Sequence, residues 1–79
     1  MPKEQLEDWF KENLASELAL KPHQISLNSP IEDYRLDSLS SVSLSYSLEE
    51  FLGYEIEPTI FNEFETVNEL IEWLLKKNN

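Results

Sequence analysis

Apolar residues recur at helical spacing in three stretches of this chain. In the first stretch, over about residues 3–19, they return every three or four positions: Leu6, Trp9, Phe10, Leu14 and Leu18. This period predicts an amphipathic helix that turns one face toward a core. Proline suits the start of a helix and stops a helix that precedes it, so Pro2 and Pro22 fit the two ends.

The second helical stretch runs from about Ser38 to Leu52, with Asp37 or Ser38 as its N-cap and Gly53 as its C-terminal stop. It carries two apolar stripes, one made of Leu44, Leu48 and Leu52 with Phe51 beside them, the other of Leu39, Val42 and Tyr46. Position 44 lies about 140° around the helix from position 39, so the stripes face different ways. One stripe is therefore expected in the core, and the other is either covered by a loop or exposed to a partner.

The third helical stretch begins after Thr66, whose spacing to Glu69 matches a capping box, and ends in Lys76 and Lys77, which suit the helix dipole. Its apolar residues share one side: Val67, Leu70, Ile71, Leu74 and Leu75. A further short helix is predicted from Ile60 to Phe64.

Helical periodicity is lost from Lys21 to about Asp37. Within this connection, Ser29-Pro30-Ile31-Glu32 has the form of an N-cap, a proline at the first helical position and a glutamate at the third, which predicts a single helical turn. A loop this long in a small domain usually has a function or packing of its own. We therefore predict one all-α domain over residues 1–79, a small four-helix bundle of three main helices and one short helix, with a long loop between helices 1 and 2.

The charge of the chain narrows its possible partners. Sixteen acidic residues against six basic ones give a net charge of −10. Such a chain repels phosphate backbones and anionic lipid headgroups, so we expect neither nucleic acid nor membrane as a partner, whereas basic protein surfaces fit. The surplus carboxylates are also consistent with solubility alone. No apolar run is long enough to span a membrane, and residues 1–5 lack the apolar core of a signal peptide, so a cytoplasmic protein is expected.

Catalytic groups are scarce. The one histidine, His23, lies in the long loop, where an exposed side chain is expected rather than a member of a triad. Acidic pairs such as Glu49-Glu50 fit a solvated face, and a single glycine excludes a glycine-rich phosphate loop. The spacing typical of metal ligands is absent as well. The sequence thus predicts neither an enzyme nor a metal site.

One segment, Tyr34-Arg35-Leu36-Asp37-Ser38-Leu39, lies where the loop becomes the second helix. A serine at this position can simply cap the helix. Unpaired N–H groups and the positive end of the helix dipole would also favour a phosphate on its hydroxyl. The run Leu36-Asp37-Ser38-Leu39 resembles the Asp-Ser-Leu motif of acyl carrier proteins, whose serine accepts 4′-phosphopantetheine.

The resemblance extends from about Leu6 to Leu75. The run from Leu48 to Gly53 is similar to the end of the family's second helix. Pro58-Thr59-Ile60 and the run from Thr66 to Ile71 resemble the third and fourth helices of carrier domains in polyketide synthases.

The resemblance implies that a phosphopantetheinyl transferase, using Mg²⁺ and coenzyme A, attaches the arm to Ser38. Asp37 would cap the helix and shape the transferase contact, with Leu39 beside the attachment point. The arm would then present acyl or polyketide thioesters to acyl-activating, ketosynthase or acyltransferase-type enzymes. The expected partner surface comprises Leu39, Val42, Tyr46, Arg35, Glu49 and Glu50. A monomer is expected. Whether the carrier is freestanding or part of a larger synthase stays open, although Met1 and the polar run Lys76-Lys77-Asn78-Asn79 favour a freestanding carrier.

Two alternatives remain open. A peptidyl or aminoacyl carrier would use the same attachment with a different cargo, although Leu36 and Pro58-Thr59-Ile60 favour acyl cargo. In an unmodified helical adaptor, Ser38 would only be a cap.

The chain departs from the family pattern in two places. Arg35 stands where such families usually have glycine, so either the loop geometry or its charge must differ. The second helix is rich in serine where relatives often carry acids: Ser40, Ser41, Ser43, Ser45 and Ser47. Recognition is therefore expected to depend more on Leu39, Val42 and Tyr46 than on acidic residues.

Overall fold

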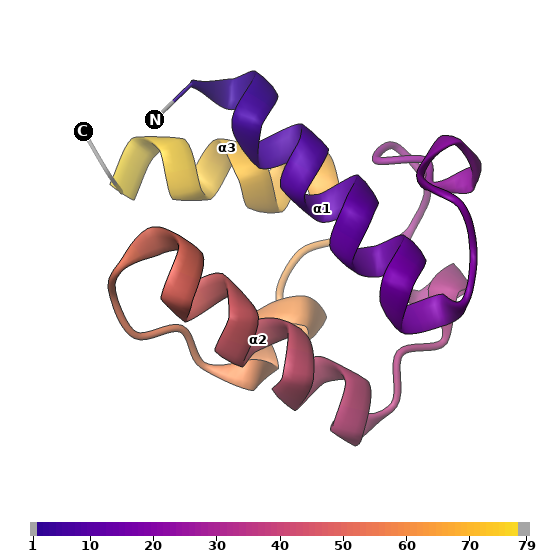
Figure 1. Ribbon diagram of the computed structural model, residues 1–79. Coiled ribbons are helices and arrows are strands. Elements are labelled where there is room, and N and C mark those ends of the chain that lie inside the picture. Colours follow the sequence, from indigo (N-terminus) through magenta and orange to yellow (C-terminus); the bar gives the residue numbers. More distant parts are fainter. Residues whose placement is uncertain (1, 78–79) are drawn as a thin grey trace.

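The computed structural model describes residues 2–77 and has three α-helices around one core (Figure 1). The helices are α1 (Lys3–Leu18), α2 (Ser38–Leu52) and α3 (Val67–Lys77). Three short 3₁₀ helices lie in the connections: η1 (Pro22–Gln24), η2 (Ile31–Tyr34) and η3 (Pro58–Asn62). Residues 2–77 contain no β-strand, and a single isolated bridge pairs Pro30 with Thr66. The predicted all-α class is confirmed.

The connections differ from the prediction in detail. The fourth helix is the 3₁₀ helix η3, which begins at Pro58 rather than Ile60 because the fixed φ of proline suits a first helical position. In η2 the N-cap is Pro30, not Ser29, so proline precedes the turn instead of starting it. The turn η1, which contains His23, was not predicted.

The core draws apolar side chains from the helices and from the connections. Its buried members include Leu6, Phe10 and Leu14 of α1, Leu44 and Leu48 of α2, Leu70, Ile71 and Leu74 of α3, and Ile25, Leu27, Ile31, Ile56, Ile60 and Phe61 between them. Three of these residues come from the long loop, so the loop packs against the core as its length suggested.

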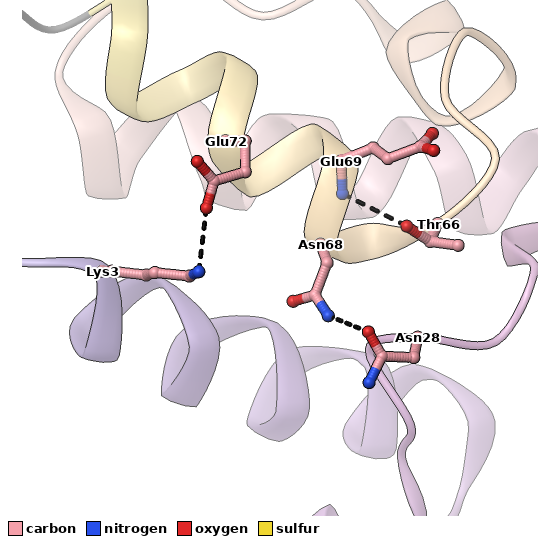
Figure 2. Close-up of polar contacts among 6 residues, drawn as sticks. All are labelled: Lys3, Asn28, Thr66, Asn68, Glu69 and Glu72. Atoms are coloured by element: carbon pink, nitrogen blue, oxygen red, sulfur yellow. Dashed lines mark hydrogen bonds and ion pairs between the residues drawn. The ribbon is translucent and has the colours of Figure 1, made fainter.

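Polar contacts fix the long loop against α3 (Figure 2). The Asn68 side-chain amide donates to the Asn28 side-chain oxygen, and the Asn68 backbone N–H donates to the Leu27 carbonyl at 3.0 Å. Farther along, the Ile31 N–H donates to the Glu65 carbonyl at 2.7 Å. These bonds satisfy backbone groups on both segments and hold the loop in place as it approaches α2.

The start and the middle of α3 are also held by polar contacts (Figure 2). At its start, the Glu69 N–H donates to Thr66 Oγ1 at 3.2 Å, while the Glu69 carboxylate accepts from the N–H of Glu65 rather than that of Thr66. The predicted capping box therefore forms with its return bond one residue earlier. At its middle, an ion pair of 2.8 Å between Lys3 Nζ and Glu72 Oε1 joins α3 to the start of α1.

Candidate functional site

Ser38 is the first residue of α2, and its side chain is exposed. Asp37 is the N-cap, because its Oδ1 accepts the Ser40 N–H at 2.7 Å. This hydrogen bond from the Ser40 backbone lowers the pKa of the Asp37 carboxyl. Within residues 2–77 the Ser38 hydroxyl makes no hydrogen bond. The side chain that caps α2 is that of Asp37, so the Ser38 hydroxyl is not used for this purpose. The hydroxyl is therefore accessible to chemical modification.

Arg35 ends η2 in the left-handed region, with φ 53° and ψ 46°, and its N–H donates to the Glu32 carbonyl at 3.0 Å. Glycine adopts this conformation without a steric cost, so the backbone suits the glycine that the family resemblance implies at this position. Arg35 keeps the backbone shape that glycine would take, so the departure lies in the charge. Among the described residues, Lys3 and Glu72 form the single ion pair with nitrogen and oxygen within 4.0 Å. The exposed Arg35 guanidinium therefore has no carboxylate partner there.

A pocket of about 590 Å³ opens between η2, the start of α2, and η3 with the segment after it. Its apolar lining is Ile31, Leu36, Phe61 and Phe64, and its polar lining includes Glu32, Arg35, Ser41, Asn62, Glu63 and Glu65. Ser41 lies one turn after Ser38 and is buried, and Ser45 one turn later is buried too. The face of α2 that starts at Ser38 therefore continues into the interior. The spacing of these serines was the available sequence signal, and the prediction did not use it.

The two stripes of α2 have opposite environments. Leu44 and Leu48 are buried, with exposed fractions of 3% and 0%. Leu39, Val42 and Tyr46 keep exposed fractions of 79%, 48% and 64%. The prediction that one stripe faces the core is confirmed, and the loop leaves the other stripe open to solvent.

Residues near the end of α2 have more varied roles. Phe51 does not join Leu48 in the core, because its ring stacks on Trp9 with centroids 5.6 Å apart and stays 37% exposed. Glu49 is half-buried, and its Oε1 accepts the Ile56 N–H at 3.0 Å. Glu50 is exposed. Of the two acids expected to contact a partner, Glu49 thus also supports the loop after α2.

Other kinds of site find no support in the described residues. His23 is exposed, as expected. Residues 2–77 contain no group of three His, Asp or Glu side chains placed to hold a metal ion. Within the same range, no helix combines the length and apolar character that crossing a bilayer requires.

Comparisons with known proteins give a consistent result. Residues 8–74 match the family model described as a phosphopantetheine attachment site. The acyl carrier protein of Treponema denticola is 34% identical over 73 residues, which cover 87% of this chain and 94% of that protein. The polyketide synthase PksL of Bacillus subtilis is 30% identical over 73 residues, which cover 92% of this chain but 2% of the synthase.

A solved structure agrees with the fold. The free-standing peptidyl carrier protein from an Acinetobacter baumannii secondary metabolic pathway superposes with a TM-score of 0.89 at 28% identity, covering 98% of this chain and 96% of that one. A phosphopantetheine arm also fits the local chemistry, because an exposed, unbonded serine hydroxyl begins α2, and Ser41 one turn later lines a pocket. The chain therefore belongs to the phosphopantetheine attachment family, as a carrier domain of the acyl carrier protein type.

Proposed function

We propose that this chain is an acyl carrier protein that bears acyl or polyketide intermediates on a 4′-phosphopantetheine arm attached to Ser38. The observation that carries the proposal is the exposed hydroxyl of Ser38 at the first residue of α2, left unbonded because Asp37 caps the helix. A phosphate on that oxygen would lie at the helix N-terminus, where backbone N–H groups and the dipole favour negative charge.

The chain's own contribution is position rather than bond-making. When bound, the arm supplies a terminal thiol that holds the acyl group as a thioester. Ser38 provides the attachment oxygen, and Asp37 keeps the first turn of α2 formed without using that oxygen. Tethering raises the effective concentration of the cargo at each partner enzyme. We infer no catalytic activity for the chain itself.

The partners follow from the exposed face of α2. Leu39, Val42 and Tyr46 form an apolar strip beside Ser38, and Glu50 adds a negative charge farther along the helix. A phosphopantetheinyl transferase and acyl-activating, ketosynthase or acyltransferase-type enzymes would dock on this strip, with apolar anchors supplying most of the binding energy. Within this proposal the chain acts as a cytoplasmic monomer, without nucleic acid or membrane partners.

Aminoacyl or peptidyl cargo is the second candidate. The similarity to a free-standing peptidyl carrier protein favours it, since the two chains share one fold over nearly their whole length. The two cargo classes share the attachment at Ser38. Offering the loaded protein to an acyl-activating ligase and to an amino acid-adenylating enzyme separates them, because the preferred activating enzyme identifies the cargo.

Intact-mass measurement tests the attachment site. The protein is incubated with coenzyme A, Mg²⁺ and a broad-specificity transferase, and a mass gain of one phosphopantetheine group is expected. Ser38→Ala should abolish that gain and keep the wild-type melting temperature, since Asp37 makes the cap contact. Ser43→Ala removes an exposed serine from the same helix and should load normally. Persistent loading of Ser38→Ala would reject the assignment, and peptide mapping would identify the serine used.

A further inference from the structure

Arg35 is the only arginine of a chain with sixteen acidic and six basic residues. Carboxylates are abundant, yet none lies within 4.0 Å of its guanidinium in the described part of the chain. The residue also occupies a left-handed backbone conformation that disfavours any side chain. An unpaired cation held at a strained position, three residues before Ser38, needs an explanation that the fold does not provide.

The surroundings of Arg35 indicate what it could bind. Arg35 lines the pocket together with Glu32, Glu63 and Glu65, so three negative charges accompany one positive charge. A carboxylate on a cargo inside this pocket would meet net repulsion. An anion on Ser38 would instead lie at the N-terminus of α2, three residues after Arg35 and outside the residues that line the pocket. The arrangement therefore favours an anion fixed at Ser38 over an anionic cargo.

We propose that Arg35 binds the phosphodiester that joins the arm to Ser38 and so holds the arm on the pocket side of α2. This inference rests on the proposed function, because it requires modification of Ser38. Guanidinium groups bind phosphate oxygens through paired hydrogen bonds, which a lysine ammonium cannot reproduce in the same geometry. The contact is exposed, so its strength should be modest and should fall with salt.

The test compares the unmodified and loaded forms of the wild type, Arg35→Gln, Arg35→Lys and Lys21→Gln. Arg35→Gln and Lys21→Gln each change the net charge from −10 to −11, and Lys21 is an exposed loop residue outside the pocket, which makes it the matched control. The first readout is the change in melting temperature on loading. Effects of the phosphate on the helix dipole are common to all variants and cancel in the comparison.

We expect loading to raise the melting temperature less in Arg35→Gln than in the wild type and in Lys21→Gln, with Arg35→Lys intermediate. The difference should disappear between about 10 mM and about 500 mM salt, where the screening length falls several-fold. The second readout is the Nε–H signal in a nitrogen-15 correlation spectrum, which a single arginine makes unambiguous. That signal should shift on loading, equally with no cargo, acetyl or malonyl on the thiol.

Each other result overturns the inference in a distinct way. Loading confirmed by mass with an unmoved Arg35 signal, or with equal melting shifts in Arg35→Gln and Lys21→Gln, would reject the contact and leave the attachment site intact. A shift seen with malonyl alone would assign Arg35 to the cargo carboxylate instead of the phosphodiester. Failure of the wild type to gain mass would reject the proposed function itself.

Discussion

The two faces of α2 offer a direct comparison between fold and recognition. Leu48 and Tyr46 lie two residues apart on one helix, but Leu48 has no exposed surface and Tyr46 is 64% exposed. Replacing each by alanine introduces the same strong helix former, so differences in helix propensity are small beside the effect of burial. Any large difference in stability between the two variants then reflects the contacts that each side chain makes in the folded protein.

The expected magnitudes differ by several-fold. Removing a fully buried leucine costs about 2–5 kcal/mol through lost transfer energy and a cavity. For a domain of 79 residues the total stability is on the order of 4–12 kcal/mol, so Leu48→Ala removes a large share. Each kcal/mol of lost stability lowers the melting temperature of a domain this size by about 4–8 °C. Tyr46→Ala should change stability by at most about 0.5 kcal/mol, as is usual for exposed positions.

The rate of loading by the transferase should show the opposite ranking: Tyr46→Ala should be impaired more than Leu48→Ala. Tyr46 lies in the exposed strip, so Tyr46→Ala should slow loading about tenfold or more if it anchors the interface. Leu48→Ala, assayed well below its melting temperature, should load close to the wild-type rate. Urea denaturation gives the stabilities, and intact mass against time gives the rates. Equal destabilisation by both changes would show that α2 is buried on both sides, and recognition would then have to use the loop before Ser38.

Two further predictions concern the ends of α2. Gly53 has φ 85°, and a Cβ placed there meets no atom within 4 Å. Gly53→Ala should therefore lower the free energy of unfolding, measured by urea denaturation, only by the left-handed backbone penalty of about 1–2 kcal/mol. A larger loss of stability would indicate a steric contact. The pKa of Asp37 is lowered by the Ser40 N–H, so the stability from its carboxylate is present above the ordinary value of 3.8 and is lost as pH falls through the lowered value. The difference in urea midpoint between the wild type and Asp37→Asn should therefore be constant from neutral pH to about pH 5 and change only below about pH 4; a change near neutral pH would contradict this cause.

The three helices could be predicted from sequence because their apolar residues repeat over many turns. Each additional turn at the same period strengthens the helical interpretation, as for Leu44 and Leu48. Short turns lack that repetition, which is why η3 was placed two residues late and η1 was missed. The sequence does not distinguish Asp37 from Ser38 as the N-cap of α2, because both residue types are good caps. The hydrogen bond from the Ser40 N–H to the Asp37 carboxylate in the structure decides between them.

The pocket lined by Leu36 and Ser41 could not be derived from the sequence pattern. Its lining comes from η2, from α2 and from the segment around η3, which lie far apart in the sequence and meet only through tertiary packing. In the sequence, the serines of α2 were noted only as residues that stand where relatives often carry acids. In the structure Ser41 and Ser45 are buried, and the Ser45 hydroxyl donates to the Val42 carbonyl at 2.8 Å. A hydroxyl that bonds its own helix can be buried at little cost, so serine content alone does not identify an exposed face.

The approach to Ser38 combines a fixed backbone with a free hydroxyl. The Tyr34 hydroxyl accepts the Ser26 N–H at 2.8 Å and donates to the Ser26 carbonyl, so the end of η2 is tied to the start of the loop. Asp37 then fixes the first turn of α2 through Ser40. Because these neighbours make the structural contacts, Ser38 can be modified without loss of a bond that holds the fold. A group mounted on such a point would have its origin defined and its far end mobile, which is what delivery of one tethered cargo to several enzymes requires.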